Sequence, residues 1–179
     1  MLRAGSADII SNGHGLPVTP PGKPSDHPMK RILRTMTRAA ALEAVKEIYR
    51  ELTTRPIERS CIHRTECCQF RLTGRTPFLT RGEALVAAEA ARASGRKHLP
   101  PSTGGACPLL DQSSGRCRIY EGRPFGCRTH FCAAAGGPYA RREVVDLIHR
   151  LEEIDRALGG TEAMALPIAL ERTLREKAL

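Results

Sequence analysis

The sequence predicts a mainly α-helical fold with irregular loops, in which helices flank a small cysteine-rich domain. Apolar residues recur at three- and four-residue steps on both sides of this domain, as they do along one face of an amphipathic helix. All seven cysteines of the 179-residue chain lie between positions 61 and 132, and glycine and proline interrupt any helical pattern around the last four. A chain of this length can form one domain with its own core.

The chain divides into four segments. Residues 1–28 are rich in glycine and proline and poor in apolar side chains, so we expect a disordered tail. Residues 29–55 are expected to form an amphipathic helix that ends before Pro56. Residues 56–138 hold the cysteines, and residues 139–179 are expected to form C-terminal helices that pack on them. The apolar stripe of the first helix comprises Ile32, Leu33, Met36, Ala40, Val45, Ile48, Tyr49 and Leu52.

One helix inside the cysteine-rich segment has a clear beginning and end. Thr80 and Glu83 have the spacing of a capping box, in which each side chain accepts a hydrogen bond from the other residue's backbone. We therefore expect a helix from Arg81 to Ala93, closed by Gly95. Around residues 107–132 we expect turns, loops and short strands at most.

Two further helical stretches are expected after Pro138. The first ends at Gly159 and Gly160, because glycine commonly ends a helix. The second, interrupted near Pro167, runs to about Leu174. The apolar stripe of the first stretch comprises Val144, Val145, Leu147, Ile148, Leu151, Ile154 and Leu158.

The cysteines predict a metal centre. They form two groups, which are Cys61, Cys67 and Cys68, and then Cys107, Cys117, Cys127 and Cys132. Thiolate is a strong ligand for zinc and for the iron of iron–sulfur clusters. Disulfides require an oxidising compartment, and seven is an odd number. Because aromatic residues are few and tryptophan is absent, a bound metal would also staple a small aliphatic core.

The sequence also predicts the compartment. The first ten residues lack the charged and then apolar layout of a signal peptide. No run approaches the ~18 apolar residues that a membrane span needs. We therefore expect a soluble, cytoplasmic protein with no membrane partner, in which thiols stay reduced.

The net charge of +9 is concentrated near the cysteines. Residues 56–138 contain twelve basic and six acidic side chains. Arginines beside cysteines would favour the thiolate form that binds metal. The same charge could instead contact nucleic acid. We do not favour that alternative, because the few aromatic residues are not interleaved with the basic ones.

The second cysteine group carries motifs that identify a resemblance. They are Cys107-Pro-Leu-Leu110, Cys117-Arg-Ile-Tyr120 and Arg123-Pro-Phe-Gly-Cys-Arg128, followed by Cys132. In this order they resemble the YkgJ-type cysteine-cluster family, whose proteins are described as zinc- or iron-chelating. The resemblance covers roughly residues 60–135. It implies that the cysteines chelate zinc or iron, the latter also as an iron–sulfur cluster.

The first cysteine group departs from the family pattern C-x2-C-x2-C-C, because Arg64 occupies its second cysteine position. His63 or His130 is a candidate replacement ligand, since imidazole binds both zinc and iron. The ligand number, and hence the choice between one centre and two, stays open. The adjacent Cys67 and Cys68 are expected to point in different directions, as ligands of two centres or of a polynuclear one, or as one ligand and one bystander.

Other residues near the motifs have roles around the metal ligands. Arg123 and Arg128 are candidates to donate hydrogen bonds to thiolates or to backbone carbonyls as a second shell. The segment from Phe70 to Thr80 either packs over the cysteines or forms an ordinary loop that leads into the capped helix.

Three functions follow from these observations. The first is metal binding, with an unknown downstream role and an unknown protein partner. The second is an iron–sulfur-dependent enzyme that carries out redox chemistry or protein methyl transfer. Some relatives of the family resemble iron–sulfur-dependent protein methylases. The third is a zinc-stapled module that binds nucleic acid or protein. The sequence contains no nucleotide-binding glycine motif, zinc-protease motif or nucleophile elbow, so enzymatic activity stays undecided and is not favoured.

Overall fold

The computed structural model describes residues 36–57, 59, 61–62, 64–102 and 104–176. The expected tail over 1–28 and the candidate ligand His63 lie outside these residues. Within them the chain forms six α-helices, four two-residue β-strands and four short 3₁₀ turns, joined by irregular loops. This confirms the predicted mainly α-helical class.

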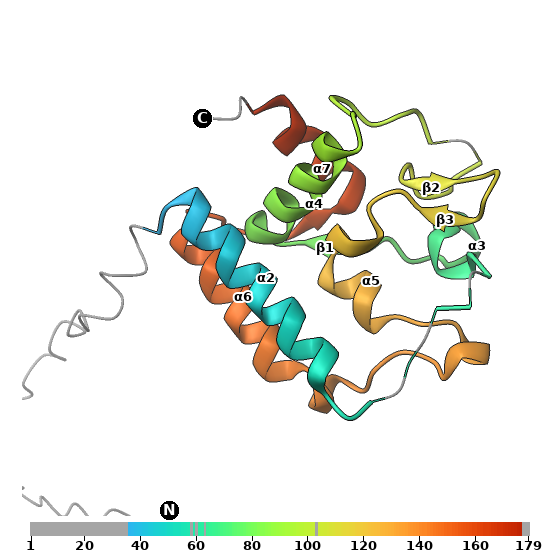
Figure 1. Cartoon of the computed structure of the whole chain (residues 1–179), viewed down its shortest axis with the longest axis horizontal. Helices are drawn as coiled ribbons and strands as arrows, with labels where there is room; N and C mark the ends of the chain where they lie inside the picture. The colour runs from blue at the N-terminus through green and yellow to red at the C-terminus, as the bar shows by residue number, and fades with distance from the viewer. Residues whose placement is uncertain (1–35, 58, 60, 63, 103, 177–179) are drawn as a thin grey trace, which may run out of the picture.

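Helices α2 (Arg38–Thr54) and α6 (Val145–Ala157) lie side by side and antiparallel, at the left of Figure 1. Arg55, just after α2, forms an ion pair with Asp146 in the first turn of α6, with Nη2 and Oδ2 2.5 Å apart. Their apolar faces form one hydrophobic core, which comprises Ala41, Val45, Ile48, Tyr49, Leu52, Val86, Phe125, Val144, Leu147, Leu151 and Ile154.

Helix α2 begins later than the apolar stripe predicts. Thr37 is its N-cap, and the Thr37 hydroxyl oxygen accepts a hydrogen bond from the backbone N–H of Ala40 at 3.2 Å. Met36 and Thr37 therefore precede the helix, and residues 29–35 lie outside the described part of the chain. The helix ends before Pro56 as expected, since Arg55 is already extended.

Helix α4 (Arg81–Ala93) is the central element and contacts α2, α6 and α7. Its predicted capping box is confirmed. The backbone N–H of Thr80 donates to Glu83 Oε2 at 3.0 Å, and the N–H of Glu83 donates to the Thr80 hydroxyl oxygen at 3.4 Å. Gly95 follows with a φ of +80°, a left-handed conformation that glycine adopts without strain.

Helix α7 (Leu166–Arg175) covers the other side of α4. The expectation that Pro167 interrupts this helix is wrong, because Pro167 lies in its first turn, where no helical partner for its missing N–H is needed. Strand β4 (Met164–Ala165) pairs antiparallel with β1 (Phe78–Leu79) and fixes this start. Gly159, with a φ of +73°, follows α6 as predicted.

A second hydrophobic core joins the cysteine segment to α4 and α7. This core contains residues from both sides of position 139, where the sequence predicts the boundary between the cysteine-rich segment and the C-terminal helices. The boundary itself stays a prediction. This core comprises Leu79, Ala84, Ala87, Ala88, Ala91, Ala106, Cys107, Leu109, Leu110, Ile119, Leu166, Ala169, Leu170 and Leu174.

The remaining elements are short and carry the cysteines. They are α3 (Phe70–Thr73), β2 (Leu110–Asp111), β3 (Arg116–Cys117) and α5 (Phe125–Thr129), at the centre and right of Figure 1. The prediction of turns and strands without helix around the second cysteine group is wrong for α5. A five-residue helix is too short to show an apolar period in the sequence.

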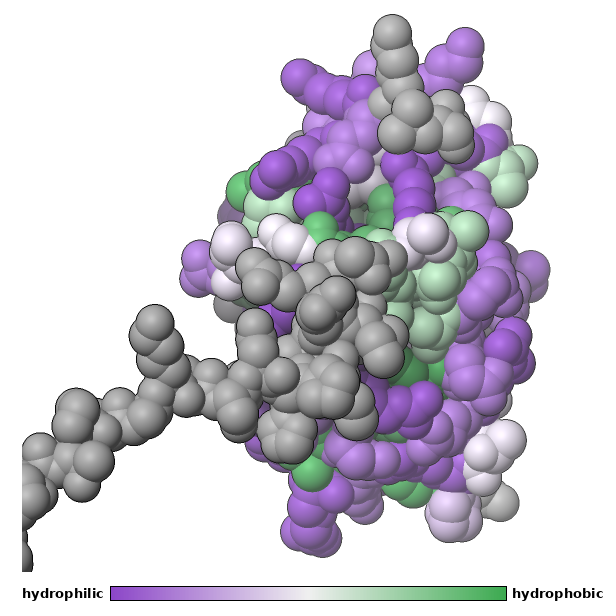
Figure 2. Space-filling model, turned by 90° about the vertical axis from the view of Figure 1, so that its left-hand side faces the viewer, coloured by the Kyte–Doolittle hydropathy of each residue, from purple (hydrophilic) through white to green (hydrophobic). Residues whose placement is uncertain are grey.

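The surface is mostly hydrophilic where Figure 2 shows it, on the side from which α2 begins. Hydrophobic residues appear there mainly in recesses between polar side chains. Among the helices of the described residues, none combines the length and the apolar composition needed to cross a membrane.

Candidate metal centre

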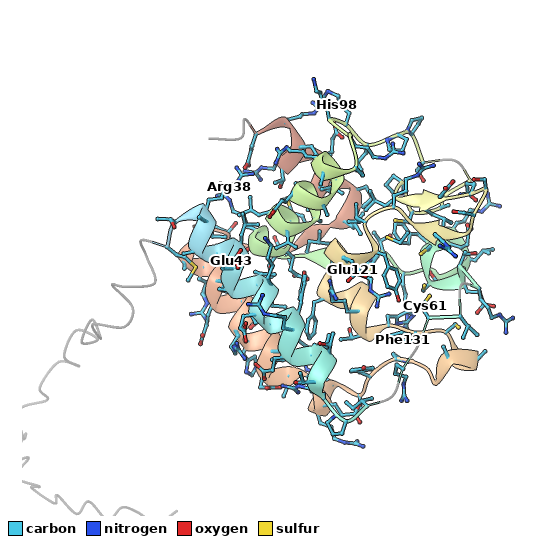
Figure 3. The ribbon with its side chains drawn as sticks, in the orientation of Figure 1. Arg38, Glu43, Cys61, His98, Glu121 and Phe131 are labelled. Atoms are coloured by element: carbon cyan, nitrogen blue, oxygen red, sulfur yellow. The ribbon has the colours of Figure 1, made fainter. Side chains whose placement is uncertain are left out.

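The two cysteine groups meet around one cavity of about 470 Å³. Its walls come from α3, the loop before β1, the β2–β3 hairpin and α5, so residues far apart in the sequence face the same space. Figure 3 places Cys61 in this part of the molecule, between α3 and the chain that follows α5. The cysteines that line the cavity are Cys61, Cys67, Cys68, Cys107, Cys117 and Cys127.

A smaller cavity of about 30 Å³ shares part of its wall with the first one. Cys61, Cys67 and Cys127 line both cavities, and Cys132 lines the smaller one. His130 lines both as well. Every cysteine of the chain therefore faces one of two spaces with a common wall, together with one of the two candidate histidines.

A tight turn holds the first cysteine group. The 3₁₀ turn Glu66–Cys68 brings the sulfur atoms of Cys67 and Cys68 to 3.9 Å from each other. The expectation that these side chains point apart is therefore wrong, because a 3₁₀ turn curls the backbone instead of alternating the side chains as a strand does. Thr65, which precedes the turn, has a left-handed φ of 59°.

Backbone hydrogen bonds bring the second group to the first. The N–H of Cys107 donates to the carbonyl of Cys68 at 2.7 Å, which ties the two groups directly. In the β2–β3 hairpin, Cys117 lies opposite Leu110, whose N–H donates to the Cys107 carbonyl at 3.0 Å. The hairpin thus returns Cys117 to the neighbourhood of Cys107.

Glu83 positions the helix that carries Cys127. This carboxylate is buried, and its Oε1 accepts a hydrogen bond from the N–H of Phe125 at 2.8 Å. Its Oε2 accepts from the backbone and the hydroxyl of Thr80. Burial raises the pKa of Glu83, while these hydrogen bonds oppose the rise. One side chain therefore caps α4 and anchors α5, a second role that the sequence analysis missed.

Arg128 supports the backbone and lines neither cavity. Its Nε donates to the carbonyl of Arg123 at 2.9 Å, and one of its terminal nitrogens donates to the carbonyl of Glu121. The guanidinium lies over the ring of Tyr49, 4.2 Å from the centroid. Arg128 thus connects the backbone of residues 121–123, which precedes Cys127, to Tyr49 of helix α2.

Arg123 lies beside the thiols and lines both cavities. Its guanidinium covers the ring of Tyr120 at 3.9 Å. Its Nε is buried and has no hydrogen-bond partner among the described residues. A buried donor without a partner is costly, and an anionic sulfur in the cavity would satisfy it.

Arg64 occupies the position of the missing family cysteine, and its side chain contacts an acidic residue. It forms an exposed ion pair with Glu66 at 2.9 Å and borders the smaller cavity. The chain therefore uses this position for a surface contact beside the centre.

The thiols differ in acidity because they are buried together. The hydrogen bond with Cys68 lowers the pKa of Cys67 to about 6, and the charge of Arg123 adds to this effect. The same hydrogen bond and burial raise the pKa of Cys68. Burial raises the pKa of Cys107 to about 12, and it also raises the pKa of Cys117 and Cys127.

This donor set suits a metal cation. Several thiolates cannot be buried together without a compensating charge, and a divalent ion supplies it while displacing the thiol protons. No group of three or more cysteine, histidine, aspartate or glutamate side chains in the described ranges already has the arrangement of a metal site. The side chains would have to move toward the metal to ligate it.

Known proteins give one point of comparison. Residues 59–144 match the family model CxxCxxCC, described as "Putative zinc- or iron-chelating domain". The matched segment contains all seven cysteines and α4, and it ends just before α6. No curated protein and no solved structure matches the chain. The match confirms the resemblance seen in the motifs and supports metal binding by this segment.

Proposed function

We propose that this chain, whose residues 59–144 match the CxxCxxCC family model, binds its metal through both cysteine groups at once. The observation that carries the proposal is that six of the seven cysteines line one cavity. The bond from the Cys107 N–H to the Cys68 carbonyl keeps the two groups together. Metal binding would therefore cross-link segments about forty residues apart and stabilise the fold.

The proposed ligands differ in position. Cys67, Cys68, Cys107, Cys117 and Cys127 border the large cavity, and we propose them as the principal thiolate ligands. Cys61 borders both cavities and Cys132 only the smaller one, where a second ion or a further ligand of the same centre would bind. Zinc and an iron–sulfur cluster both accept such a thiolate-rich set.

His130 completes this set on the side of the smaller cavity. Burial lowers the pKa of its imidazole, and the charge of Arg75 lowers it further. A lowered pKa keeps the ring neutral at physiological pH, which is the form that ligates metal. His130 is thus our candidate for the donor that Arg64 cannot provide.

The two arginines have separate roles in this proposal. Arg123 would donate from its buried Nε to a metal-bound sulfur and offset the negative charge of the thiolates. Arg128 would act away from the thiols, since it donates to the carbonyls of Arg123 and Glu121 and stacks on Tyr49. Loss of Arg123 should therefore alter the metal centre directly, whereas loss of Arg128 should first alter stability.

The test is the metal content of two single variants, Cys68→Ser and Cys117→Ser, purified and analysed beside the unchanged chain. The variants remove one cysteine from each group. Because both groups serve one centre, each variant should lose most of the bound metal. Ser94→Ala, at the end of α4 and away from both cavities, serves as the control. Full metal content in either cysteine variant would contradict a shared centre.

A further inference from the structure

The large cavity offers more space than the metal centre needs. Its volume is about 470 Å³, which lies within the range of roughly 300–1,000 Å³ typical of small-molecule sites. The cysteines border only part of it. A second part of the wall is formed by α3, the loop before β1 and the start of α7, through Phe70, Pro77, Phe78 and Leu166.

This second wall is apolar and reaches the surface. The side chain of Phe78 is 63% exposed, although it is one of the few aromatic residues of the chain. Its neighbour Leu79 is buried in the core. Because successive side chains of a strand point to opposite faces, Phe78, paired with Ala165, lies on the face of β1 away from that core. An exposed aromatic ring at the edge of an apolar cavity is a feature of ligand sites.

The charged residues of the wall are all basic. Arg75 and Arg123 line the cavity beside the neutral His130, and no carboxylate of the described residues does. Arg123 is the arginine whose charge favours the thiolates of Cys67 and Cys117.

Arg75 is placed differently. It is exposed at the loop before β1, its charge acts on His130, and its guanidinium has no hydrogen-bond or ion-pair partner among the residues that the structure describes. Arg123 thus serves the thiolates, and Arg75 is left to bind an anion from outside.

We propose that this cavity binds a small organic anion with an apolar body, beside the metal. The anionic group, a carboxylate or a phosphate, is held by Arg75, and the apolar body lies against Phe70 and Phe78. Bidentate pairing with a guanidinium gives such a group both affinity and direction. The inference deepens the proposed function, on which it rests for the metal that forms the opposite wall.

The test uses the metal-loaded full chain and the fluorescent probe 1-anilinonaphthalene-8-sulfonate, an aromatic anion. We expect saturable binding that phenyl phosphate displaces more strongly than inorganic phosphate, because only the former has an apolar body. Arg75→Gln and Phe78→Ala should each lower the affinity for the probe by about tenfold. The matched controls are Arg71→Gln and Leu72→Ala, exposed residues of α3 that do not line the cavity.

The metal content of each variant separates the two proposals. Weaker probe binding by Arg75→Gln and Phe78→Ala at unchanged metal content supports the cavity site. Equal probe binding by these variants and their controls overturns it, even when the metal is fully bound. Probe binding that depends on Arg75 in a chain that never holds metal contradicts the proposed function and leaves the anion site standing.

Discussion

Replacement of Glu83 by alanine is the most informative single substitution, because this buried carboxylate connects two elements. It caps α4 through Thr80 and accepts the hydrogen bond from the N–H of Phe125 at 2.8 Å. The Thr80 N–H would lose its acceptor, the Glu83 half of the capping box, at a cost of about 1 kcal/mol, while the Thr80 hydroxyl still caps the helix. The Phe125 N–H would be left buried without a partner, which costs about 1–3 kcal/mol. We therefore expect Glu83→Ala to lower the free energy of unfolding by about 2–4 kcal/mol.

The same variant should weaken metal binding, since Phe125 lies two residues before Cys127 in α5. Residues that orient ligands typically contribute about 10- to 100-fold to metal affinity. Urea denaturation measures the first effect, and competition with a chromophoric chelator measures the second.

Thr37→Ala is the matched control for Glu83→Ala. It removes the N-cap of α2, whose hydroxyl accepts an exposed hydrogen bond from the Ala40 N–H and lines neither cavity of the cysteines. We expect a loss of about 1 kcal/mol and an unchanged metal affinity. The reasoning is refuted if both variants destabilise the chain equally and bind metal as the unchanged protein does.

Three further predictions follow from the same structure. Gly122→Ala should destabilise the fold by about 1–3 kcal/mol in urea denaturation, because a Cβ there would lie 2.3 Å from the Cβ of Ala90; an unaltered midpoint would show that this contact is not tight. Metal affinity should rise between pH 6 and pH 8, because burial holds the pKa of the Cys107 and Cys127 thiols above neutrality and metal must displace their protons. Calorimetry in buffers of different ionisation enthalpy counts the released protons, and a pH-independent affinity would contradict the burial argument. His130→Ala should weaken metal binding whereas the exposed His149→Ala should not, as chelator competition would reveal; equal affinities would remove His130 from the ligand set.

The sequence predicts those parts of the fold whose signals are local. The capping box of Thr80 and Glu83 places α4 at its observed bounds, because both partners lie within one helical turn. The apolar stripe after Pro138 and the glycine at 159 likewise give α6.

Elements that depend on partners far away in the sequence cannot be predicted from local patterns. Helix α5 has five residues and is anchored by Glu83, which lies 42 positions earlier. Pro167 could interrupt a helix or begin one, and the pairing of β4 with β1 decides for a beginning.

The candidate centre shows the same division. Composition and motif order indicate that the cysteines act together, and the cavity brings six of them to one space. The sequence does not indicate that Arg128 turns away toward Tyr49. It leaves open whether the segment from Phe70 to Thr80 packs over the cysteines, and Arg75 and Phe78 of that segment line the cavity with them. Those positions result from the packing of α3, β1 and α5, which no local pattern encodes.

The most direct test of metal chelation is metal and acid-labile sulfide analysis of the chain purified without oxygen, together with its visible spectrum. The account predicts stoichiometric zinc in a colourless protein, or iron with sulfide in a brown one. Either metal should be retained through gel filtration, because the proposed ligands from both cysteine groups would enclose it. Protein that is fully folded and holds neither zinc nor iron, and takes up neither when reduced and supplied with them, would contradict the account.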